Sequence, residues 1–285
     1  MGSMTVDALL REGARLLTEV GHERGRLEAD LIMSHLLKTP RAHLYLRLGE
    51  SVPPKKAKVF CSFIEKRRTG VPLSYILKTQ EFMGLSFEVN PKVLIPRPET
   101  ELIVEEALGF LKKREDPWVI DMGTGSGAVA VSLAVFCSKV KVAAVDLSQS
   151  ALGVARENAR RHKVSGRVFF YEGDLFEPLL SSEQTYDGIV SNPPYIPSAT
   201  ISSLDRGVKD FEPRLALDGG EDGLCFYRRM AAYLPILLKK DGFLVWETGH
   251  DQTLRVKKIV EETNLFSKIS VKEDYAGQLR IIIAS

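Results

Sequence analysis

A predicted strand that leads through a glycine-rich loop into an apolar helix limits the folds open to this chain more than any other feature. The strand is expected at residues 118–122, and the helix begins at residue 128. The loop between them consists of Gly123, Thr124, Gly125, Ser126 and Gly127. Glycines let a backbone turn sharply and approach a ligand without side-chain interference, and the amides at such a helix start favour an anion. The unit is typical of an α/β fold that binds a small molecule beyond the strand.

The spacing of acidic residues around this loop indicates its cofactor. Asp146 ends the next predicted strand, about twenty residues beyond the loop, where its carboxylate can accept hydrogen bonds from both ribose hydroxyls of a nucleoside. Asp121 lies two residues before the first glycine, and this pattern differs from the GxGxxG of dinucleotide-binding proteins. The pattern resembles the first motif of the Rossmann-like S-adenosylmethionine methyltransferases, so we expect S-adenosylmethionine as the cofactor. A glycine-rich turn that binds nothing is the alternative.

A second acidic position follows the strand expected at residues 168–172. In the methyltransferases that the loop resembles, this position lies beside the adenine. Asp174 could therefore accept a hydrogen bond from the exocyclic amine, and Leu175 could pack against the ring. Asp174 could equally cap the N-terminus of a helix.

Strands and helices alternate from residue 96 onward. Besides the strands already named, strands are expected at residues 140–147, 188–191, 243–247, 269–272 and 279–284. This alternation predicts a Rossmann-like, mostly parallel seven-stranded sheet with helices on both faces. No helix separates the last two strands, so they should pair as an antiparallel hairpin at one edge.

The part of the chain before residue 96 has a different pattern. Apolar residues recur at helical spacing in three stretches, and Thr5 can cap the first of them. Residues 80–94 combine apolar residues with turn signals and predict a hairpin-like connector. We therefore expect a small all-helical domain at residues 1–78, a connector at residues 79–95 and a methyltransferase domain at residues 96–285.

The run Asn192-Pro193-Pro194-Tyr195, which follows the strand at residues 188–191, carries the most chemical information. An amide or aromatic amine is a poor nucleophile because its lone pair is delocalised. The Asn192 side-chain carbonyl and the Pro193 backbone carbonyl can accept hydrogen bonds from both N–H groups of such a nitrogen. The prolines stiffen the loop, and Tyr195 offers a flat face to a planar group. The run predicts methyl transfer to adenine, guanine or glutamine, unless it is only a rigid surface turn.

Several further strings accompany these motifs. They are Ile-Pro-Arg-Pro-Glu-Thr-Glu at residues 95–101, Asp-Phe-Glu-Pro-Arg at 210–214, Ala-Leu-Asp-Gly-Gly at 216–220, the spaced Glu247, Gly249 and Gln252, and the spaced Asp274, Gly277 and Arg280. With them, the chain resembles the release-factor glutamine methyltransferases (the PrmC/HemK family) over nearly its whole length.

The resemblance implies a substrate and a set of site residues. The expected reaction methylates the N5 amide nitrogen of the glutamine in the Gly-Gly-Gln motif of peptide chain release factors, with the helical domain docking that protein. By the same resemblance, residues 123–127, Asp146, Asn192 and Leu175 bind the cofactor. Asn192, Pro193 and Tyr195 are the expected catalytic residues, and these three with Pro194 hold the glutamine.

The segment from residue 205 to residue 223 is harder to interpret. It contains acidic and basic residues around Phe211 and Pro213, followed by Asp-Gly-Gly. Turns could order it as a surface loop. Our hypothesis is that it lines the acceptor channel, because it follows the asparagine motif, and that replacing Phe211 would therefore affect methyl transfer or substrate affinity.

Composition narrows the class of protein further. The net charge of +2 on 285 residues neither requires nor excludes a nucleic-acid partner. Cys61, Cys137 and Cys225 lie far apart, which argues against a zinc site or a disulfide frame and for a reducing compartment. We find no signal peptide and no apolar run long enough to span a bilayer, so a cytoplasmic protein without a membrane or metal partner is expected. Residues 1–4 read as an expression remnant.

Two other functions fit parts of the sequence. A nucleic-acid amino-methyltransferase could use the basic residues of the helical domain to follow phosphates, although a solvated charged face explains them more simply. The string at residues 95–101 and the absence of an obvious nucleic-acid-binding module argue against it. A cofactor-binding scaffold without activity would have no need of two aimed carbonyl acceptors.

Overall fold

Apolar residues at helical spacing build the first of two units in the structure, a computed structural model that describes residues 4–285. This unit comprises the chain up to Lys78 together with Arg206–Phe211. Its helices are α1 Val6–Glu19, α2 Gly25–Leu37, α3 Arg41–Leu44, α4 Pro54–Arg68, α5 Leu73–Leu77 and α9 Arg206–Lys209, with the 3-10 helix η1 Tyr45–Arg47. The Thr5 side chain accepts a hydrogen bond from the Ala8 amide and caps α1, as predicted. Helices α1, α2 and α4 bury one apolar core between them.

The expected expression remnant falls on residues 1–3, which lie outside the described residues, and on Met4, which is exposed.

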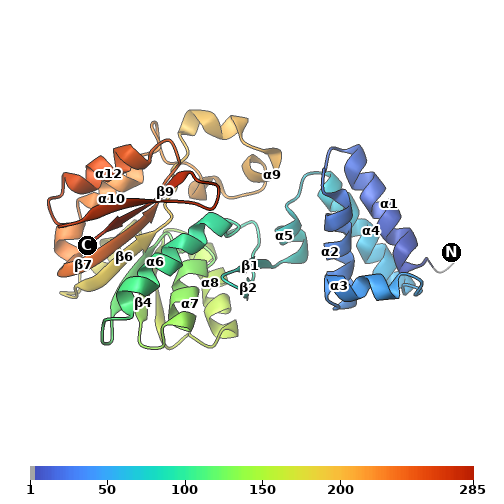
Figure 1. Cartoon of the computed structure of the whole chain (residues 1–285), viewed down its shortest axis with the longest axis horizontal. Coiled ribbons are helices and arrows are strands. Elements are labelled where there is room, and N and C mark those ends of the chain that lie inside the picture. Colours follow the sequence, from blue (N-terminus) through green and yellow to red (C-terminus); the bar gives the residue numbers. More distant parts are fainter. Residues whose placement is uncertain (1–3) are drawn as a thin grey trace. The chain divides into compact units, whose positions relative to one another are not determined.

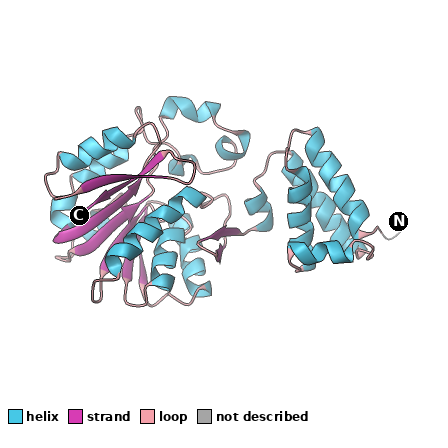
Figure 2. Cartoon of the chain, viewed as in Figure 1, coloured by secondary structure: helices cyan, strands magenta, loops and turns pink. Residues whose placement is uncertain are grey.

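The second unit, Thr79–Asp205 with Glu212–Ser285, contains the predicted seven-stranded sheet. Its strands are β3 Trp118–Met122, β4 Lys141–Asp146, β5 Val168–Glu172, β6 Tyr186–Ser191, β7 Leu238–Glu247, β8 Ile269–Glu273 and β9 Leu279–Ala284. They lie in the order β5-β4-β3-β6-β7-β9-β8 (Figure 2). The strands from β5 to β7 pair in parallel, and β9 runs antiparallel to both β7 and β8. The fold class and the antiparallel edge hairpin are therefore confirmed.

Two strands begin earlier than the sequence indicated: β6 begins at Tyr186, ahead of the expected residue 188, and β7 is extended further. Strand β7 begins at Leu238, ahead of the expected residue 243, because Leu238 pairs with Tyr186 before an irregularity in the ladder. The additional residues, which include Lys239 and Lys240, are largely exposed and lack the apolar pattern of a central strand.

The register of the sheet brings several strand ends to one level. Met122 of β3 lies opposite Val145 of β4 and Ser191 of β6, and Ser191 lies opposite Trp246 of β7. The loops that follow these strands therefore leave the sheet at the same edge. Because the chain moves from β3 first toward β4 and later toward β6, this edge holds the switch point at which ligands bind in open α/β sheets.

Helices cover both faces of the sheet (Figure 1). Helices α6 Glu101–Leu111, α7 Ala128–Phe136 and α8 Gln149–Arg161 lie on one face, and α10 Cys225–Ala231, α11 Leu234–Leu237 and α12 Thr253–Glu261 lie on the other. Alternate strand residues point into opposite cores, so Val119 packs with α6 and α7 whereas Ile120 packs with α10 and α12. Short 3-10 helices occur at η2 Pro98–Thr100, η3 Glu177–Leu179, η4 Ser198–Ser203 and η5 Arg214–Ala216.

A small hairpin precedes the sheet, as the connector pattern predicted. Strands β1 Gln80–Phe82 and β2 Leu85–Phe87 pair antiparallel. The buried Asn158 side chain of α8 fixes the chain beyond β2, because it accepts from the Glu88 amide and donates to the Glu88 carbonyl. The same side chain donates to the Ser126 carbonyl at 2.9 Å, so it also joins this segment to the glycine-rich loop.

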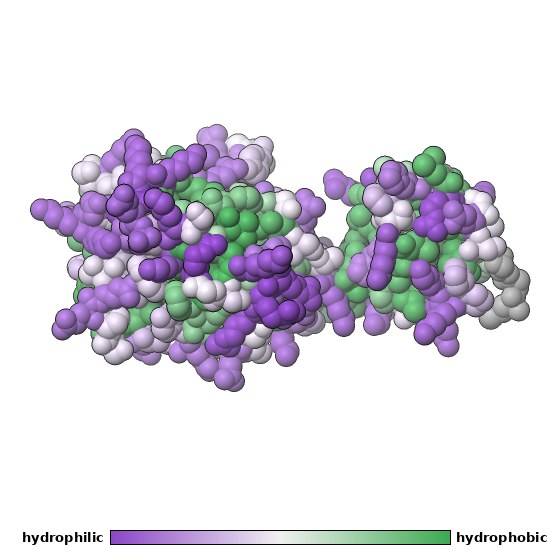
Figure 3. All heavy atoms as spheres, turned by 90° about the horizontal axis from the view of Figure 1, so that it is seen from below, coloured by the Kyte–Doolittle hydropathy of each residue, from purple (hydrophilic) through white to green (hydrophobic). Residues whose placement is uncertain are grey.

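The surface is mixed in polarity. On the face shown in Figure 3, hydrophilic residues surround an apolar area on the larger unit and alternate with apolar residues on the smaller one. Within residues 4–285, no helix is both long and apolar enough to cross a membrane.

Candidate active site

The glycine-rich loop follows β3 at the level edge of the sheet. Gly123, Gly125 and Gly127 all have positive φ, between 54° and 79°. At Gly127 a side chain is also excluded by packing, because an added Cβ would lie 3.0 Å from the Cβ of Ala155. The loop can therefore adopt this path and pass close to α8 only with glycine at this position.

Asp121 supports the loop from beneath and does not face the ligand space. Its buried carboxylate accepts hydrogen bonds from the Thr124 hydroxyl at 2.6 Å and the Ala130 amide at 3.1 Å. Burial raises the pKa of Asp121 to about 6, and the two hydrogen bonds oppose that shift. Asp121 thus joins the start of the loop to the first turn of α7.

Asp146 stands at the end of β4, beside the loop. Its two carboxylate oxygens accept from the Gly125 amide at 2.8 Å and from the Ser148 amide at 2.9 Å. Burial raises the pKa of Asp146 above its usual value, although both amides favour the charged form. Each oxygen retains a further lone pair, so the carboxylate is still able to accept from a ligand hydroxyl.

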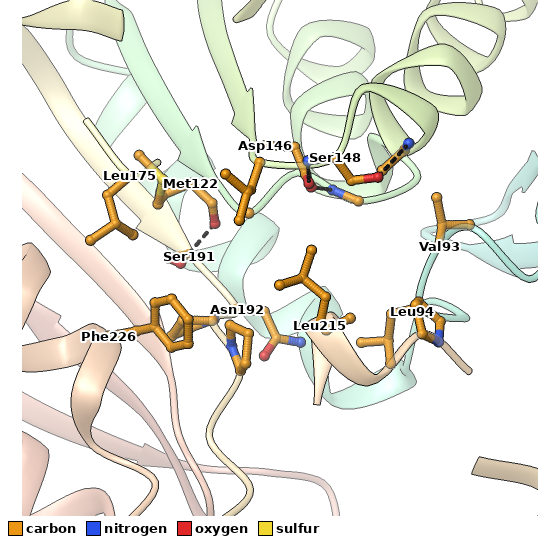
Figure 4. Close-up of a pocket in the computed structure, with 18 of the residues that line it drawn as sticks. Val93, Leu94, Met122, Asp146, Ser148, Leu175, Ser191, Asn192, Leu215 and Phe226 are labelled. Carbon is orange, nitrogen blue, oxygen red and sulfur yellow. Dashed lines mark hydrogen bonds between the residues drawn. The ribbon is translucent and has the colours of Figure 1, made fainter. Parts of the chain in front are cut away.

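A cavity opens between the glycine-rich loop and the asparagine motif (Figure 4). It encloses about 860 Å³ of space between protein atoms, including the open solvent at its mouth. The predicted site residues that line it are Gly123, Gly125, Asp146, Asp174, Leu175, Asn192, Pro193 and Pro194. Thr124, Ser126 and Gly127 do not line it; they hold the loop through Asp121, Asn158 and the contact with Ala155.

The sides of the cavity carry polar residues, and its two ends are apolar. Asp146 and Ser148 lie along one side and Asn192 along the other (Figure 4). Leu175 and Phe226 lie at one end, and Val93 and Leu94 at the opposite end. The cavity therefore combines a carboxylate and exposed glycine backbone with apolar walls.

Asp174 and Leu175 occupy one turn after β5. The Asp174 carboxylate pairs with Arg229 at 2.7 Å, and the N-cap of η3 is Phe176, so Asp174 does not cap a helix. Leu175 is buried with φ of 50°, a conformation that non-glycine residues rarely adopt. Such a conformation persists only where the surrounding structure holds it, and it occurs often beside ligands.

Asn192 is connected to the interior by its side-chain amide. Its Nδ2 donates to the Thr100 hydroxyl at 3.0 Å, and Thr100 in turn donates to Glu247 at 2.6 Å. Burial raises the pKa of Glu247 to about 7, while the Thr100 hydrogen bond and Arg280 oppose that shift. No pattern in the sequence connects these three residues, although each lies in a motif that carried the family resemblance.

A hydrogen bond and close glycine packing hold the backbone that follows Asn192. Gln252 donates to the Tyr195 carbonyl at 2.9 Å. Two glycines permit this close approach, because an added Cβ would lie 2.7 Å from Tyr195 at Gly219 and 2.3 Å from it at Gly223. Tyr195 itself is half-buried and does not line the cavity. Its hydroxyl is directed to Glu247 at 3.5 Å, at the long limit for a hydrogen bond.

A hydrogen bond and an ion pair connect the segment at residues 95–101 to the segment at residues 210–214. The buried carboxylate of Glu212 accepts from the Ile95 amide at 3.1 Å and pairs with the Arg97 guanidinium. The two strings are therefore parts of one arrangement that holds Leu94 on one side of the cavity and Leu215 near it.

The expectation for residues 205–223 is correct for part of the segment. Pro213, Leu215 and Ala216 line the cavity. Phe211 does not; it belongs to the first unit, where its ring lies against Gly70. The residues of this segment that line the cavity therefore follow Phe211 in the chain.

Comparisons with known proteins agree in both halves of the chain. A family model of the PrmC N-terminal domain matches residues 8–77, and a model of the methyltransferase small domain matches residues 100–205. A release factor glutamine methyltransferase of Moorella thermoacetica is 42% identical over 281 residues, which cover 99% of this chain and 98% of that protein. The chain belongs to the release factor glutamine methyltransferase family. A member from Geobacter sulfurreducens is also 42% identical, over 93% of this chain and 91% of its own length.

Solved structures outside the family share the fold. The catalytic domain of hMettl16, in complex with the MAT2A 3'UTR hairpin 6, covers 83% of this chain and 84% of its own with a TM-score of 0.56 and 15% identity. A methyltransferase from Pyrococcus furiosus covers 71% of this chain and 89% of its own with a TM-score of 0.50 and 20% identity. At these identities the likeness concerns the fold alone.

The cavity is chemically suited to the cofactor that the family and fold imply, S-adenosylmethionine. Asp146 offers carboxylate lone pairs to hydroxyls, and Leu175 and Phe226 offer apolar surface to a flat ring. The glycine backbone at residues 123–125 offers an unobstructed path to a small charged group, because nothing closer than 3.9 Å would meet a Cβ at Gly123. Among the described residues, no group of three or more His, Cys, Asp or Glu side chains is placed to hold a metal ion.

Proposed function

We propose that this enzyme transfers a methyl group from S-adenosylmethionine to the side-chain amide nitrogen of glutamine in the Gly-Gly-Gln motif of peptide chain release factors. The observation that carries the proposal is the near full-length similarity to release factor glutamine methyltransferases together with an intact asparagine motif on the cavity wall. The names of these relatives state their substrate, and we assign the same substrate to this chain.

Asn192 and Pro193 would hold the acceptor. Both line the cavity, and the carbonyl of the Asn192 side chain and the backbone carbonyl of Pro193 can each accept a hydrogen bond from one N–H of a primary amide. Two acceptors fix the plane of the amide and present its nitrogen in one orientation. Pro194 stiffens the backbone, and Tyr195 packs behind the loop as a positioning residue.

The cofactor would lie along the opposite side. When bound, it supplies an electrophilic methyl group on a sulfonium that carries its own leaving group. Asp146 would accept from the ribose hydroxyls, Gly123 and Gly125 would approach the methionine part, and Leu175 would pack against the adenine with Asp174 nearby. The apolar walls would exclude water from the reacting atoms.

We further propose the roles of the parts of the chain. Residues 1–78 would dock the release factor, residues 79–95 would connect, and residues 96–285 would carry the reaction. The match of residues 8–77 to the PrmC N-terminal domain supports the first assignment. A release factor acts on ribosomes, so the enzyme would work in the cytoplasm, and no direct nucleic-acid contact is required.

Methyl transfer from labelled S-adenosylmethionine to three acceptors in parallel tests the proposal. The acceptors are a purified release factor, the same factor with the glutamine of its Gly-Gly-Gln motif changed to alanine, and a mixture of total RNA and DNA. We expect label on the intact factor alone. Label on the nucleic acids, or equal label on both forms of the factor, would contradict the assigned substrate and leave the fold and family unchanged.

A further inference from the structure

A buried chain of hydrogen bonds leads away from the cavity at Asn192. The Asn192 Nδ2 donates to the Thr100 hydroxyl at 3.0 Å, and this hydroxyl donates to Glu247 Oε2 at 2.6 Å. Thr100 is 5% exposed and Glu247 is 1% exposed, and neither lines the cavity. Glu247 therefore reaches the site only through its neighbours.

The sheet and one helix start bring the three residues together. Asn192 follows β6, Glu247 ends the adjacent strand β7, and Thr100 ends η2 at the beginning of α6. The second oxygen of Glu247 faces the Tyr195 hydroxyl, and its backbone carbonyl accepts from the Tyr227 hydroxyl at 2.7 Å. Thr100 thus bridges two strand ends that are not themselves joined by side chains.

The charge on Glu247 determines the direction of the two hydrogen bonds that connect Glu247, Thr100 and Asn192. Above pH 7, where Glu247 is mostly ionised, its carboxylate has no hydrogen, so the Thr100 hydroxyl must donate to it. Threonine has a single hydroxyl hydrogen, so Thr100 can only accept from Asn192. Only the NH₂ end of the Asn192 amide can donate, so its carbonyl oxygen is left for another partner.

We propose that Glu247 is a positioning residue that acts through Thr100 to make Asn192 present its carbonyl oxygen, and not its NH₂ group, to the acceptor nitrogen. The inference rests on the proposed function, because it matters only if the acceptor offers N–H groups to Asn192. A reversed Asn192 would place its own N–H groups against those of the substrate.

Replacing Glu247 with glutamine should reverse the direction of the hydrogen bonds that connect Glu247, Thr100 and Asn192. Tyr195 is a hydroxyl donor, because burial and the neighbouring Glu247 raise the pKa of its phenol above the usual range. In the Glu247→Gln variant the amide oxygen would therefore turn toward Tyr195 and the NH₂ group toward Thr100. Thr100 would then donate to Asn192 and draw the asparagine carbonyl away from the substrate.

Kinetics on a release factor test this directly. We expect Glu247→Gln and Thr100→Val to lower kcat by roughly 10- to 100-fold while the affinity for S-adenosylhomocysteine is unchanged. Thr100→Ser, which keeps the hydroxyl, should retain wild-type kcat. Asp187→Asn is the matched control, since Asp187 is a buried carboxylate at the other end of β6 that bonds Arg114 and Lys239. It should leave kcat unchanged.

The double variant separates positioning from a general structural role. If both residues act on Asn192 alone, adding Glu247→Gln to Thr100→Val should cause no further loss of kcat. Losses that multiply, or equal activity of Thr100→Ser and Thr100→Val, would overturn the inference.

A measurement that needs no acceptor keeps this inference distinct from the proposed function. In a ¹H–¹⁵N spectrum, the side-chain NH₂ signals of Asn192, assigned by their loss in Asn192→Asp, should include one proton that exchanges slowly in the wild type and in Thr100→Ser. That protection should disappear in Thr100→Val, and the signals should shift in Glu247→Gln. Failure of the wild type to methylate any release factor would reject the proposed function, whereas unchanged Asn192 signals in both variants would reject the role of Glu247.

Discussion

Glu247 is a buried acidic residue whose enclosure disfavours its ionised form. Its carboxyl is enclosed, and burial raises its pKa from 4.5 to about 7, with Glu99 adding to the shift and Thr100, Arg280 and Tyr195 opposing it. Other titratable groups near it are Arg97 and Tyr227, which interact with Tyr195 or with Glu247 itself. A carboxyl in this setting resists ionisation, so Glu247 loses its proton in the folded protein only as the pH rises through about 7.

Stability should therefore depend on pH at this position. The folded pKa lies above the unfolded value, so the unfolded chain releases its proton first and stability falls as pH rises from about 4.5 to about 7. The loss amounts to about 3 kcal/mol by pH 8. Glu247→Gln should remove it, so the variant should gain unfolding free energy relative to wild type at pH 8 and show little difference at pH 4.5. Denaturant unfolding at the two pH values measures this; a variant less stable than wild type at pH 8 would contradict it.

Asp146 allows a prediction about cofactor affinity. Asp146→Ala removes the carboxylate that the cavity offers to ribose hydroxyls, which should cost about 1–3 kcal/mol of binding, or roughly 10- to 100-fold in Kd. Titration calorimetry with S-adenosylhomocysteine measures the change. Asp187→Asn is the control, because this carboxylate lies outside the cavity and the change should leave the affinity unaltered. Equal affinity in Asp146→Ala and wild type would remove Asp146 from the cofactor site.

At the scale of elements, the strands and helices were predictable from the sequence, whereas the contacts that hold the loops in place were not. Strands such as β3 and β9 follow from runs of apolar residues between turn signals, and their pairing follows from the presence or absence of a helix between them. The glycine-rich loop and Asp146 were predictable because their spacing along the chain is fixed by one strand and one helix.

The contacts that complete the site join residues far apart in the sequence. Asn192 and Thr100 are 92 positions apart, and Ile95 and Glu212 are 117 positions apart. Neither pair leaves a local pattern, since Thr100 alone fits a helix start and Glu212 alone fits a surface charge. For the same reason the sequence did not show which part of residues 205–223 lines the cavity, which Pro213 and Leu215 do and Phe211 does not.

The fastening between residues 95–97 and Glu212 can be tested at this scale. Glu212→Gln keeps the shape but weakens two charge-assisted hydrogen bonds to a buried position, so it should lower the free energy of unfolding by about 1–3 kcal/mol. Denaturant unfolding measures this. Glu65→Gln, which removes an exposed pair with Arg68, is the control and should cause little change. Equal effects of the two changes would show that the fastening contributes nothing.

At the scale of the whole molecule, two motifs about seventy residues apart act as one site because parallel strands β3 and β6 are neighbours and end at one level. The glycine-rich loop follows one strand and Asn192 follows the other, so a cofactor and an acceptor can meet between them. The family relationship extends over both units, and for this reason we assign a protein as substrate, although the hMettl16 catalytic domain, which shares the fold, was solved in complex with the MAT2A 3'UTR hairpin 6.

The most direct test of that assignment is tandem mass spectrometry of the Gly-Gly-Gln peptide from a release factor incubated with this enzyme and S-adenosylmethionine. We expect one added methyl group on the glutamine side-chain nitrogen, and none when the Asn192→Ala variant replaces the wild-type enzyme. An unmodified glutamine in a reaction where the wild-type enzyme consumes S-adenosylmethionine, or a methyl group on another residue of the factor, would contradict it.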